Sequence, residues 1–303
     1  MKRPVIAITG LHGAIGKRLI SMELFNDWNI VDLYRTYQMG YSSNVLHVPM
    51  DLTDDDSIQE TLERVRPEVI LHMAAVAHID TCEHDRDHGK NGLTWKVNVQ
   101  ATEKIAQYAK SNNCFLIYLS TECVFDGKKD KYTEHDAVNP INWYGVTKAE
   151  AESRIIEIMN NNYAIVRSNM AYHPHDEQKT IFGKVISLFE KQESFQMVDD
   201  QYMTPTFTDD ILKGIKTVIE TKESGINHVV PREVITPFDF GIKVAKRFGY
   251  DEVLLKPISI LDFFGKERAK LRLKHACLDG IMTEKKLQFV SRSVDIALQE
   301  MVV

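Results

Sequence analysis

Residues 5–16 read Val5-Ile6-Ala7-Ile8-Thr9-Gly10-Leu11-His12-Gly13-Ala14-Ile15-Gly16, an apolar run followed by spaced glycines. The apolar run predicts a strand, and Leu19, Ile20 and Leu24 continue at helical spacing. Glycines at a strand-to-helix turn let the backbone approach a pyrophosphate, which the helix N-terminus can bind. The stretch therefore predicts a dinucleotide site, with a turn that binds nothing as the alternative. The candidate cofactor-binding residues are Gly10, His12, Gly13, Ala14, Ile15 and Gly16.

Apolar strand-like runs and helical patterns alternate beyond this turn. Further strands are expected near 28–34, 44–48, 67–75, 115–119 and 164–167. This alternation predicts an α/β fold of the Rossmann type, a doubly wound parallel sheet with a smaller α/β substrate-binding lobe. We assign residues 1–167 to an NAD(P)-binding domain, to which part of 195–230 returns, and residues 168–303 mainly to the substrate-binding lobe.

The end of the second strand bears on the choice of cofactor. Asp32 lies inside the strand, too early to reach the adenosine ribose, whereas Arg35 falls where a guanidinium can pair with a 2′-phosphate. We therefore expect NADP(H), with NAD(H) as the alternative. Asp51 and Leu52 are placed to contact the adenine, although a helix-capping role for Asp51 is equally compatible. The fourth strand ends in small residues that let a cofactor pass close to the main chain: Ala74, Ala75 and Val76.

The candidate catalytic residues begin with two hydroxyl side chains at the end of the fifth strand. Ser120 and Thr121 stand where ligands bind in an open parallel sheet, and Thr121 can hydrogen-bond a substrate carbonyl. Tyr144 and Lys148 are one helical turn apart on a helix preceded by Pro140. An ammonium beside a phenol lowers the phenol pKa, so Tyr144 is expected to exchange a proton. Ser120, Tyr144 and Lys148 are also expected to contact the cofactor.

These motifs resemble those of the extended short-chain dehydrogenase/reductases, and within them the dTDP-4-dehydrorhamnose reductases. The resemblance rests on Gly10 to Gly16, Ser120-Thr121-Glu122-Cys123-Val124-Phe125-Asp126-Gly127, Pro140 to Lys148, and Asp200 to Thr206. It implies a catalytic triad of Thr121, Tyr144 and Lys148. It also implies NAD(P)H-dependent reduction of the C4 ketone of a nucleotide-linked 4-keto-6-deoxy sugar, as in polysaccharide biosynthesis. By the same resemblance, the residues at the substrate are Thr121, Glu122, Asn169 and Met170.

Departures from the family pattern separate the alternatives. Glu122 stands where the reductases have Asp, and Cys123 stands where the related dehydratases place a second carboxylate, which disfavours elimination of water. Two other readings stay open: a sugar-nucleotide epimerase of the same family, and a cofactor-binding regulatory subunit that resembles the beta subunit of methionine adenosyltransferase.

The amino-acid composition indicates which kinds of binding partner and which cellular compartment are expected. The formal net charge of -6 argues against nucleic acid, and the apolar runs are too short for a membrane span. Four cysteines without a Cys-x-x-Cys pair, and no secretion signal, favour a cytoplasmic location. We expect no metal, although segments 77–88 and 199–200 carry acidic or histidine groups. The oligomeric state stays open, a homodimer being one option.

Overall fold

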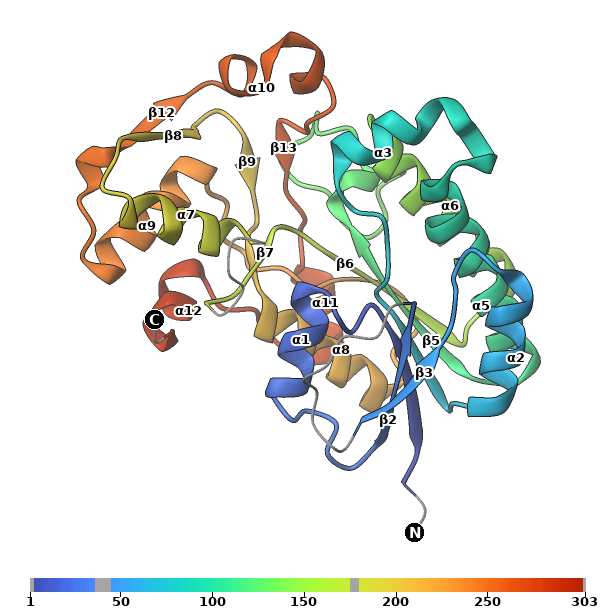
Figure 1. The fold of residues 1–303 in the computed structure, drawn as a ribbon. Coiled ribbons are helices and arrows are strands. Elements are labelled where there is room, and N and C mark those ends of the chain that lie inside the picture. Colours follow the sequence, from blue (N-terminus) through green and yellow to red (C-terminus); the bar gives the residue numbers. More distant parts are fainter. Residues whose placement is uncertain (1–2, 36–44, 175–179, 302–303) are drawn as a thin grey trace.

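A seven-stranded parallel sheet forms the centre of the molecule (Figure 1). The computed structural model describes residues 3–35, 45–174 and 180–301. The strand order is β11-β6-β5-β4-β1-β2-β3. The chain adds β2 and β3 on one side of β1 and then crosses to the other side to add β4, β5 and β6, so the order of the strands across the sheet reverses between β1 and β4. Ligands bind at such a reversal, beyond the carboxyl ends of the strands. The predicted Rossmann-type sheet is confirmed, with strands β1 (Val5–Thr9), β2 (Asn29–Tyr34), β3 (Val45–Pro49), β4 (Val69–His72), β5 (Phe115–Thr121), β6 (Tyr163–Ser168) and β11 (Gly225–His228).

Helices cover both faces of this sheet. Successive residues of a strand point to opposite faces, so Ala7 packs into one core while Ile6 and Ile8 pack into the other. Because both faces are buried, the strands are apolar along their whole length. One face is covered by α2 (Asp55–Val65), α5 (Ala101–Ser111) and α6 (Trp143–Met159), and the other by α1 (Ala14–Ser21), α8 (Thr208–Thr221) and α11 (Ile281–Leu287) (Figure 1).

The connection from β4 to α5 is mostly helical. The segment 77–88, which carries acidic and histidine side chains, forms α3 (Ile79–Asp85) and the start of a 3-10 helix, η1 (Arg86–Asn91). The His78 ring caps α3 by accepting the Thr81 backbone N–H at 3.4 Å. A short helix, α4 (Leu93–Trp95), and a π-helical turn, η2 (Lys96–Gln100), then lead into α5.

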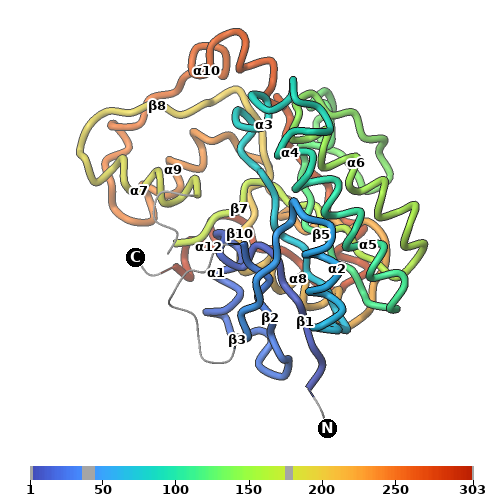
Figure 2. The backbone as a smooth tube through the Cα atoms, turned by 45° about the vertical axis from the view of Figure 1, so that its right-hand side comes forward, coloured from blue at the N-terminus to red at the C-terminus, as the bar shows by residue number. Residues whose placement is uncertain are grey.

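The smaller lobe is built from later segments and lies above the sheet in Figure 2. Its core is rich in aromatic side chains, including Phe182, Phe189 and Phe240. Three two-stranded parallel pairs join β10 with β7, β12 with β8, and β13 with β9. Its elements are β7 (Ala171–Tyr172), α7 (Ile181–Glu190), β8 (Phe195–Val198), β9 (Tyr202–Met203), β10 (Thr206–Phe207), α9 (Pro237–Phe248), 3-10 helix η4 (Glu252–Leu254), β12 (Leu255–Ile258), α10 (Ile260–Ala269), β13 (His275–Ala276) and α12 (Val294–Glu300).

The two parts of the chain are interleaved. β11 pairs with β6 and α8 packs on the large sheet, although both follow the first segments of the smaller lobe. The division into residues 1–167 for the cofactor and 168–303 mainly for the substrate stays a prediction. In the described residues no helix is long and apolar enough to cross a lipid bilayer.

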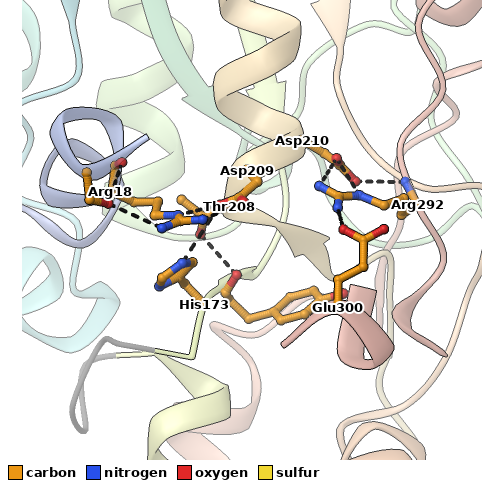
Figure 3. Close-up of polar contacts among 9 residues, drawn as sticks. Arg18, His173, Thr208, Asp209, Asp210, Arg292 and Glu300 are labelled. Atoms are coloured by element: carbon orange, nitrogen blue, oxygen red, sulfur yellow. Dashed lines mark hydrogen bonds and ion pairs between the residues drawn. The ribbon is translucent and has the colours of Figure 1, made fainter. Parts of the chain in front are cut away.

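Two neighbouring carboxylates at the start of α8 tie these parts together (Figure 3). The guanidinium of Arg18, on α1, donates to both oxygens of Asp209 at 2.6 and 2.7 Å. The next residue, Asp210, accepts from the Arg292 guanidinium at 2.6 and 2.9 Å and from the Arg292 backbone N–H at 2.7 Å. One turn of α8 therefore fixes the first helix of the chain and the segment that leads into α12.

A second ion-pair cluster joins α3 to the far end of the smaller lobe. Asp80 accepts from Arg268 at 2.5 Å and from Arg272 at 2.7 Å. These two arginines belong to the basic segment 266–274. In the structure both are bound to Asp80.

Candidate functional site

Two adjoining cavities lie along the carboxyl edge of the sheet. The first, of about 540 Å³, is called here the β2-side cavity, and the second, of about 500 Å³, the β5-side cavity. Gly10 and Ala75 line both, so the two cavities meet at the glycine turn. Predicted residues on the β2-side cavity are His12, Arg35, Asp51, Leu52, Ala74 and Val76. Those on the β5-side cavity are Gly13, Ala14, Ile15, Gly16, Ser120, Thr121, Glu122, Tyr144, Lys148, Asn169 and Met170.

The glycine turn is shaped by a close approach to the loop after β4. Gly10 has φ +77°, and a Cβ there would lie 2.7 Å from the backbone nitrogen of Ala74. The Thr9 hydroxyl holds that loop in place by accepting the N–H groups of Met73 and Ala74 at 3.2 and 3.1 Å. Only glycine fits this position without moving the main chain. The cradle and the helix that begins behind it suit a dinucleotide pyrophosphate.

Asn98 fixes the same loop from the π-helical turn. Its amide accepts the Val76 N–H at 2.8 Å, and donates to the Val76 carbonyl and to the Thr147 hydroxyl, each at 3.0 Å. It thereby links the cofactor loop to α6. The sequence did not single out this residue, and a buried polar side chain in a π-helical turn, a feature common at functional sites, is visible only in the structure.

The β2-side cavity is backed by a buried carboxylate that holds two histidines. Asp32 is fully buried, and its Oδ2 lies 2.9 Å from His12 Nε2 and 2.9 Å from His47 Nδ1. His47 was not predicted, because only the β2–β3 register places it opposite Asp32. Arg35 lines the cavity near Asp51, whose carboxyl pKa is lowered by hydrogen bonds from Thr53.

At the end of β5 the Thr121 hydroxyl both donates and accepts a hydrogen bond. It accepts the N–H of Cys123 at 3.2 Å and donates to Glu122 Oε2 at 2.7 Å. The 3-10 helix η3 (Glu122–Val124) follows directly. Burial raises the pKa of the Glu122 carboxyl, and the hydrogen bond from Thr121 opposes this.

Helix α6 brings Tyr144 to Thr121. Asn142 caps the helix by accepting the Gly145 N–H at 2.7 Å. A Cβ on Gly145 would lie 2.0 Å from the Cys123 carbonyl oxygen, so glycine lets α6 come this close to η3. Burial raises the pKa of the Tyr144 phenol well above its usual value, and the neighbouring Cys123 and Glu122 act in the same direction.

Lys148 is almost fully buried and does not act on this phenol as expected. Its Nζ donates to the Leu119 carbonyl oxygen at 2.7 Å and lies 3.8 Å from the Tyr118 ring centroid. Burial lowers the pKa of the Lys148 amine to about 7, against the pull of Glu152. The prediction that Lys148 lowers the phenol pKa is wrong for this arrangement, because burial dominates both groups.

The two hydroxyls at the end of β5 point to different neighbours. Ser120 Oγ donates to Glu152 Oε1 at 2.5 Å. Glu152 also accepts from Nε and Nη2 of Arg167 at 3.0 and 2.5 Å, in an ion pair that is almost fully buried. Ser120 therefore takes part in a hydrogen-bond network with α6 and β6 at the edge of the β5-side cavity, whereas Thr121 lies beside Tyr144.

The two predicted substrate residues after β6 differ in environment. Asn169 is buried and its side-chain amide donates to the Ala276 carbonyl, which anchors the cavity wall to the smaller lobe. Met170 is 40% exposed and has φ +35°, a conformation that side chains with a Cβ rarely adopt. This strained turn presents the thioether at the cavity.

In the two segments considered for a metal, several acidic and histidine side chains bind other protein groups. Asp200 accepts the Ile260 N–H at 2.6 Å, and the His88 ring lies 3.1 Å from Asp85. Within residues 3–35, 45–174 and 180–301, no group of three or more His, Cys, Asp or Glu is arranged to hold a metal ion.

The reversal of strand order, the glycine turn and the two adjoining cavities define a Rossmann-type dinucleotide-binding protein. Residues 3–303 match the model of the RmlD substrate binding domain, and the chain belongs to this family.

Similar proteins include sugar-nucleotide reductases and a subunit of methionine adenosyltransferase. The chain is 25% identical over 252 residues to dTDP-4-keto-6-deoxy-D-glucose reductase of Streptomyces niveus, covering 83% of this chain and 81% of that protein. It is 28% identical over 264 residues to methionine adenosyltransferase 2 subunit beta of Danio rerio, covering 84% and 77%. The crystal structure of dTDP-4-dehydrorhamnose reductase from Bacillus anthracis in complex with NADP is 25% identical, with a TM-score of 0.84 over 98% of both chains.

Proposed function

We propose that the chain catalyses the NAD(P)H-dependent reduction of the C4 ketone of a nucleotide-linked 4-keto-6-deoxy sugar, with NADP(H) preferred. The observation that carries this proposal is the meeting of Thr121, Tyr144 and Lys148 on one cavity that adjoins the glycine turn. Membership of the RmlD family and the likeness to reductases that act on such ketones support it.

The proposed roles follow from the chemistry of each side chain. The reduced nicotinamide, when bound, supplies the hydride that reaches C4. Tyr144 donates a proton to the ketone oxygen, which balances the hydride and yields the alcohol. Thr121 donates a hydrogen bond to the same oxygen, and Lys148 holds the cofactor at the inner end of the cavity. Glu122, Asn169 and Met170 form the wall against which the sugar binds.

The neutral phenol is the form that this role needs. Burial raises the pKa of Tyr144, so the proton stays on the oxygen until the substrate draws it away.

The direct test is oxidation of NADPH or NADH by purified protein with dTDP-4-dehydrorhamnose or a related 4-keto sugar, followed by the nicotinamide absorbance. We expect one cofactor oxidised per ketone reduced. Tyr144→Phe keeps the ring and loses the proton, so turnover should fall about 10²- to 10⁴-fold. Its cofactor affinity, measured by fluorescence, should change little.

Two outcomes would favour other functions. A sugar isomerised without net oxidation of cofactor would point to an epimerase of the same family. Cofactor binding without any ketone reduction would favour a cofactor-binding regulatory subunit; the Danio rerio relative is named as a subunit of methionine adenosyltransferase. A binding subunit needs no proton donor, so the grouping of Thr121, Tyr144 and Lys148 argues for the reductase.

A cytoplasmic location and a homodimeric assembly also remain proposals. The four cysteines are buried and unbridged, which is compatible with a reducing compartment. Sedimentation of the purified protein tests the dimer.

A further inference from the structure

Lys148 is a buried amine that contacts a carbonyl oxygen and an aromatic ring. The residue is 2% exposed, and its Nζ donates to the Leu119 carbonyl oxygen at 2.7 Å. The same Nζ lies 3.8 Å from the centroid of the Tyr118 ring, which is also buried. Tyr118 and Leu119 are neighbours on β5, so one strand supplies both contacts.

Three titratable groups surround Lys148 on the two elements that pack against it. Glu152, one turn further along α6, attracts the amine, but each of its oxygens accepts a hydrogen bond from the Arg167 guanidinium, at 3.0 and 2.5 Å. His72, on β4, is neutral, because burial and the nearby Lys148 lower the pKa of its imidazole to about 3. The Tyr144 phenol is neutral too, because burial raises its pKa. Since Arg167 offsets the charge of Glu152, little carboxylate attraction is left for Lys148.

A buried amine with weak carboxylate attraction releases its proton easily. Burial accordingly lowers the pKa of Lys148 to about 7. The face of an aromatic ring carries partial negative charge and attracts a cation, most strongly where water is excluded. A neutral amine gains no such attraction, so a ring at 3.8 Å favours the charged form. The Tyr118 ring therefore opposes the effect of burial on Lys148.

We propose that the face of the Tyr118 ring keeps Lys148 in its ammonium form at the inner end of the β5-side cavity, which makes Tyr118 a positioning residue for the reduction. This inference rests on the proposed function, in which Lys148 holds the cofactor. An ammonium has three N–H donors, of which the Leu119 carbonyl takes one and leaves two for a ligand. Loss of the proton would remove one of these donors together with the positive charge.

Titration of Lys148 itself tests the inference without substrate or cofactor. In protein labelled with ¹³C at the lysine Cε, the NMR signal of Lys148 is the one that Lys148→Met lacks. Tyr118→Leu removes the ring, so the midpoint of the Lys148 titration should fall by about 1.5 pH units, the value expected for a buried cation–π contact. Tyr118→Phe keeps the face of the ring and should titrate as the unmodified protein does.

A graded series of rings covers the case in which Tyr118→Leu does not fold. Phenylalanines with one, two or three ring fluorines, placed at position 118, keep the ring while fluorine withdraws electron density from its face. The midpoint should fall with each added fluorine. The matched control is Phe115→Leu, which removes another buried ring of β5, one that lies 4.6 Å from Lys222 Nζ. It should leave the Lys148 midpoint unchanged.

Cofactor binding connects this titration to the proposed reaction. The affinity for NADPH, measured by fluorescence against pH, should decline at lower pH in Tyr118→Leu than in Tyr118→Phe, because the ammonium is the form that holds the cofactor. kcat/KM for the 4-keto sugar should follow the same order.

The outcomes separate this inference from the proposed function. An unchanged Lys148 midpoint in Tyr118→Leu or across the fluorinated series would overturn the inference and leave the reductase proposal intact. An equal fall in Tyr118→Phe would also overturn it, because the hydroxyl and not the ring would then act on Lys148. A midpoint that follows the ring in a protein that reduces no 4-keto sugar would support the ring as the partner of Lys148 and overturn the proposed function.

Discussion

The hydrogen bond between Thr121 and Glu122 gives a sharp prediction for the variant Glu122→Gln. A threonine hydroxyl has one proton and two lone pairs. In the structure one lone pair accepts the Cys123 N–H and the proton goes to Glu122. While Glu122 is ionised, Thr121 therefore has no proton left for a substrate ketone. A protonated Glu122 can instead donate to the second lone pair of Thr121 and release that proton for the substrate.

The size of the effect follows from the bond that must break. A hydrogen bond to a charged group contributes about 1.5–3 kcal/mol. Freeing the Thr121 proton from an ionised Glu122 should therefore lower kcat/KM by about 10- to 150-fold. Burial raises the pKa of Glu122, so the active, protonated form persists to higher pH than an exposed glutamate would allow. Activity should be high below that pKa and fall above it.

The assay is kcat/KM for the 4-keto sugar against pH, at saturating cofactor. A glutamine amide can donate to Thr121 at every pH, so Glu122→Gln should lose the decline that Glu122 causes and keep activity within about tenfold of the unmodified protein at low pH. Any decline of kcat/KM with pH that both proteins share is caused by ionisation of Lys148 or Tyr144. Glu134→Gln is the matched control, because Glu134 accepts a 2.6 Å hydrogen bond from Thr283 away from both cavities.

Two results would refute this reasoning. Identical pH profiles for the unmodified protein and Glu122→Gln would mean that ionisation of Glu122 does not control Thr121. Loss of activity at every pH, with binding of the cofactor intact, would mean that Glu122 itself acts on the substrate instead of orienting Thr121.

Two further predictions concern buried charges. Arg167→Met leaves Glu152 buried without its cation, so the free energy of unfolding in urea should fall by about 3–5 kcal/mol. Lys216→Met removes the partner of the exposed Glu220 and should cost at most about 1 kcal/mol. Equal losses would contradict the role of burial. Lys148 has a folded-state pKa of about 7, below its usual 10.5. The unfolded chain therefore binds the extra proton between these values, and the stability of the unmodified protein relative to Lys148→Met should rise from pH 7 to about 10 in urea titrations, a flat difference being the contrary result.

The sheet and the glycine turn could be predicted because they depend on local patterns. The apolar run Val5 to Ile8 before the glycine turn and the helical spacing after Gly16 are enough to predict a strand, a turn and a helix. The grouping of Thr121, Tyr144 and Lys148 on one cavity also follows from order along the chain, since the carboxyl ends of parallel strands share one edge.

Contacts that depend on register or burial could not be predicted. His47 meets Asp32 only because β2 and β3 pair with these two residues opposite each other. Nothing local distinguishes Ser120 from Thr121, yet Ser120 donates its hydrogen bond to Glu152 of α6, whereas Thr121 donates to the neighbouring Glu122. The pKa of Tyr144 depends on how deeply the phenol is buried, which spacing along a helix does not reveal.

The position of β11 at the outer edge of the sheet has a consequence for synthesis of the protein. β6 ends at Ser168, but β11, the edge strand that pairs with it, is complete only at His228. Several segments of the smaller lobe, from β7 to β10, lie between them in the sequence. At about 5–20 residues per second, a ribosome needs roughly 3–12 s to add the intervening 60 residues, 169 to 228. During that interval the nascent sheet presents an unpaired apolar edge, the kind of surface on which chains pair wrongly. Slow or paused translation between these positions should therefore increase aggregation of this chain and its dependence on chaperones.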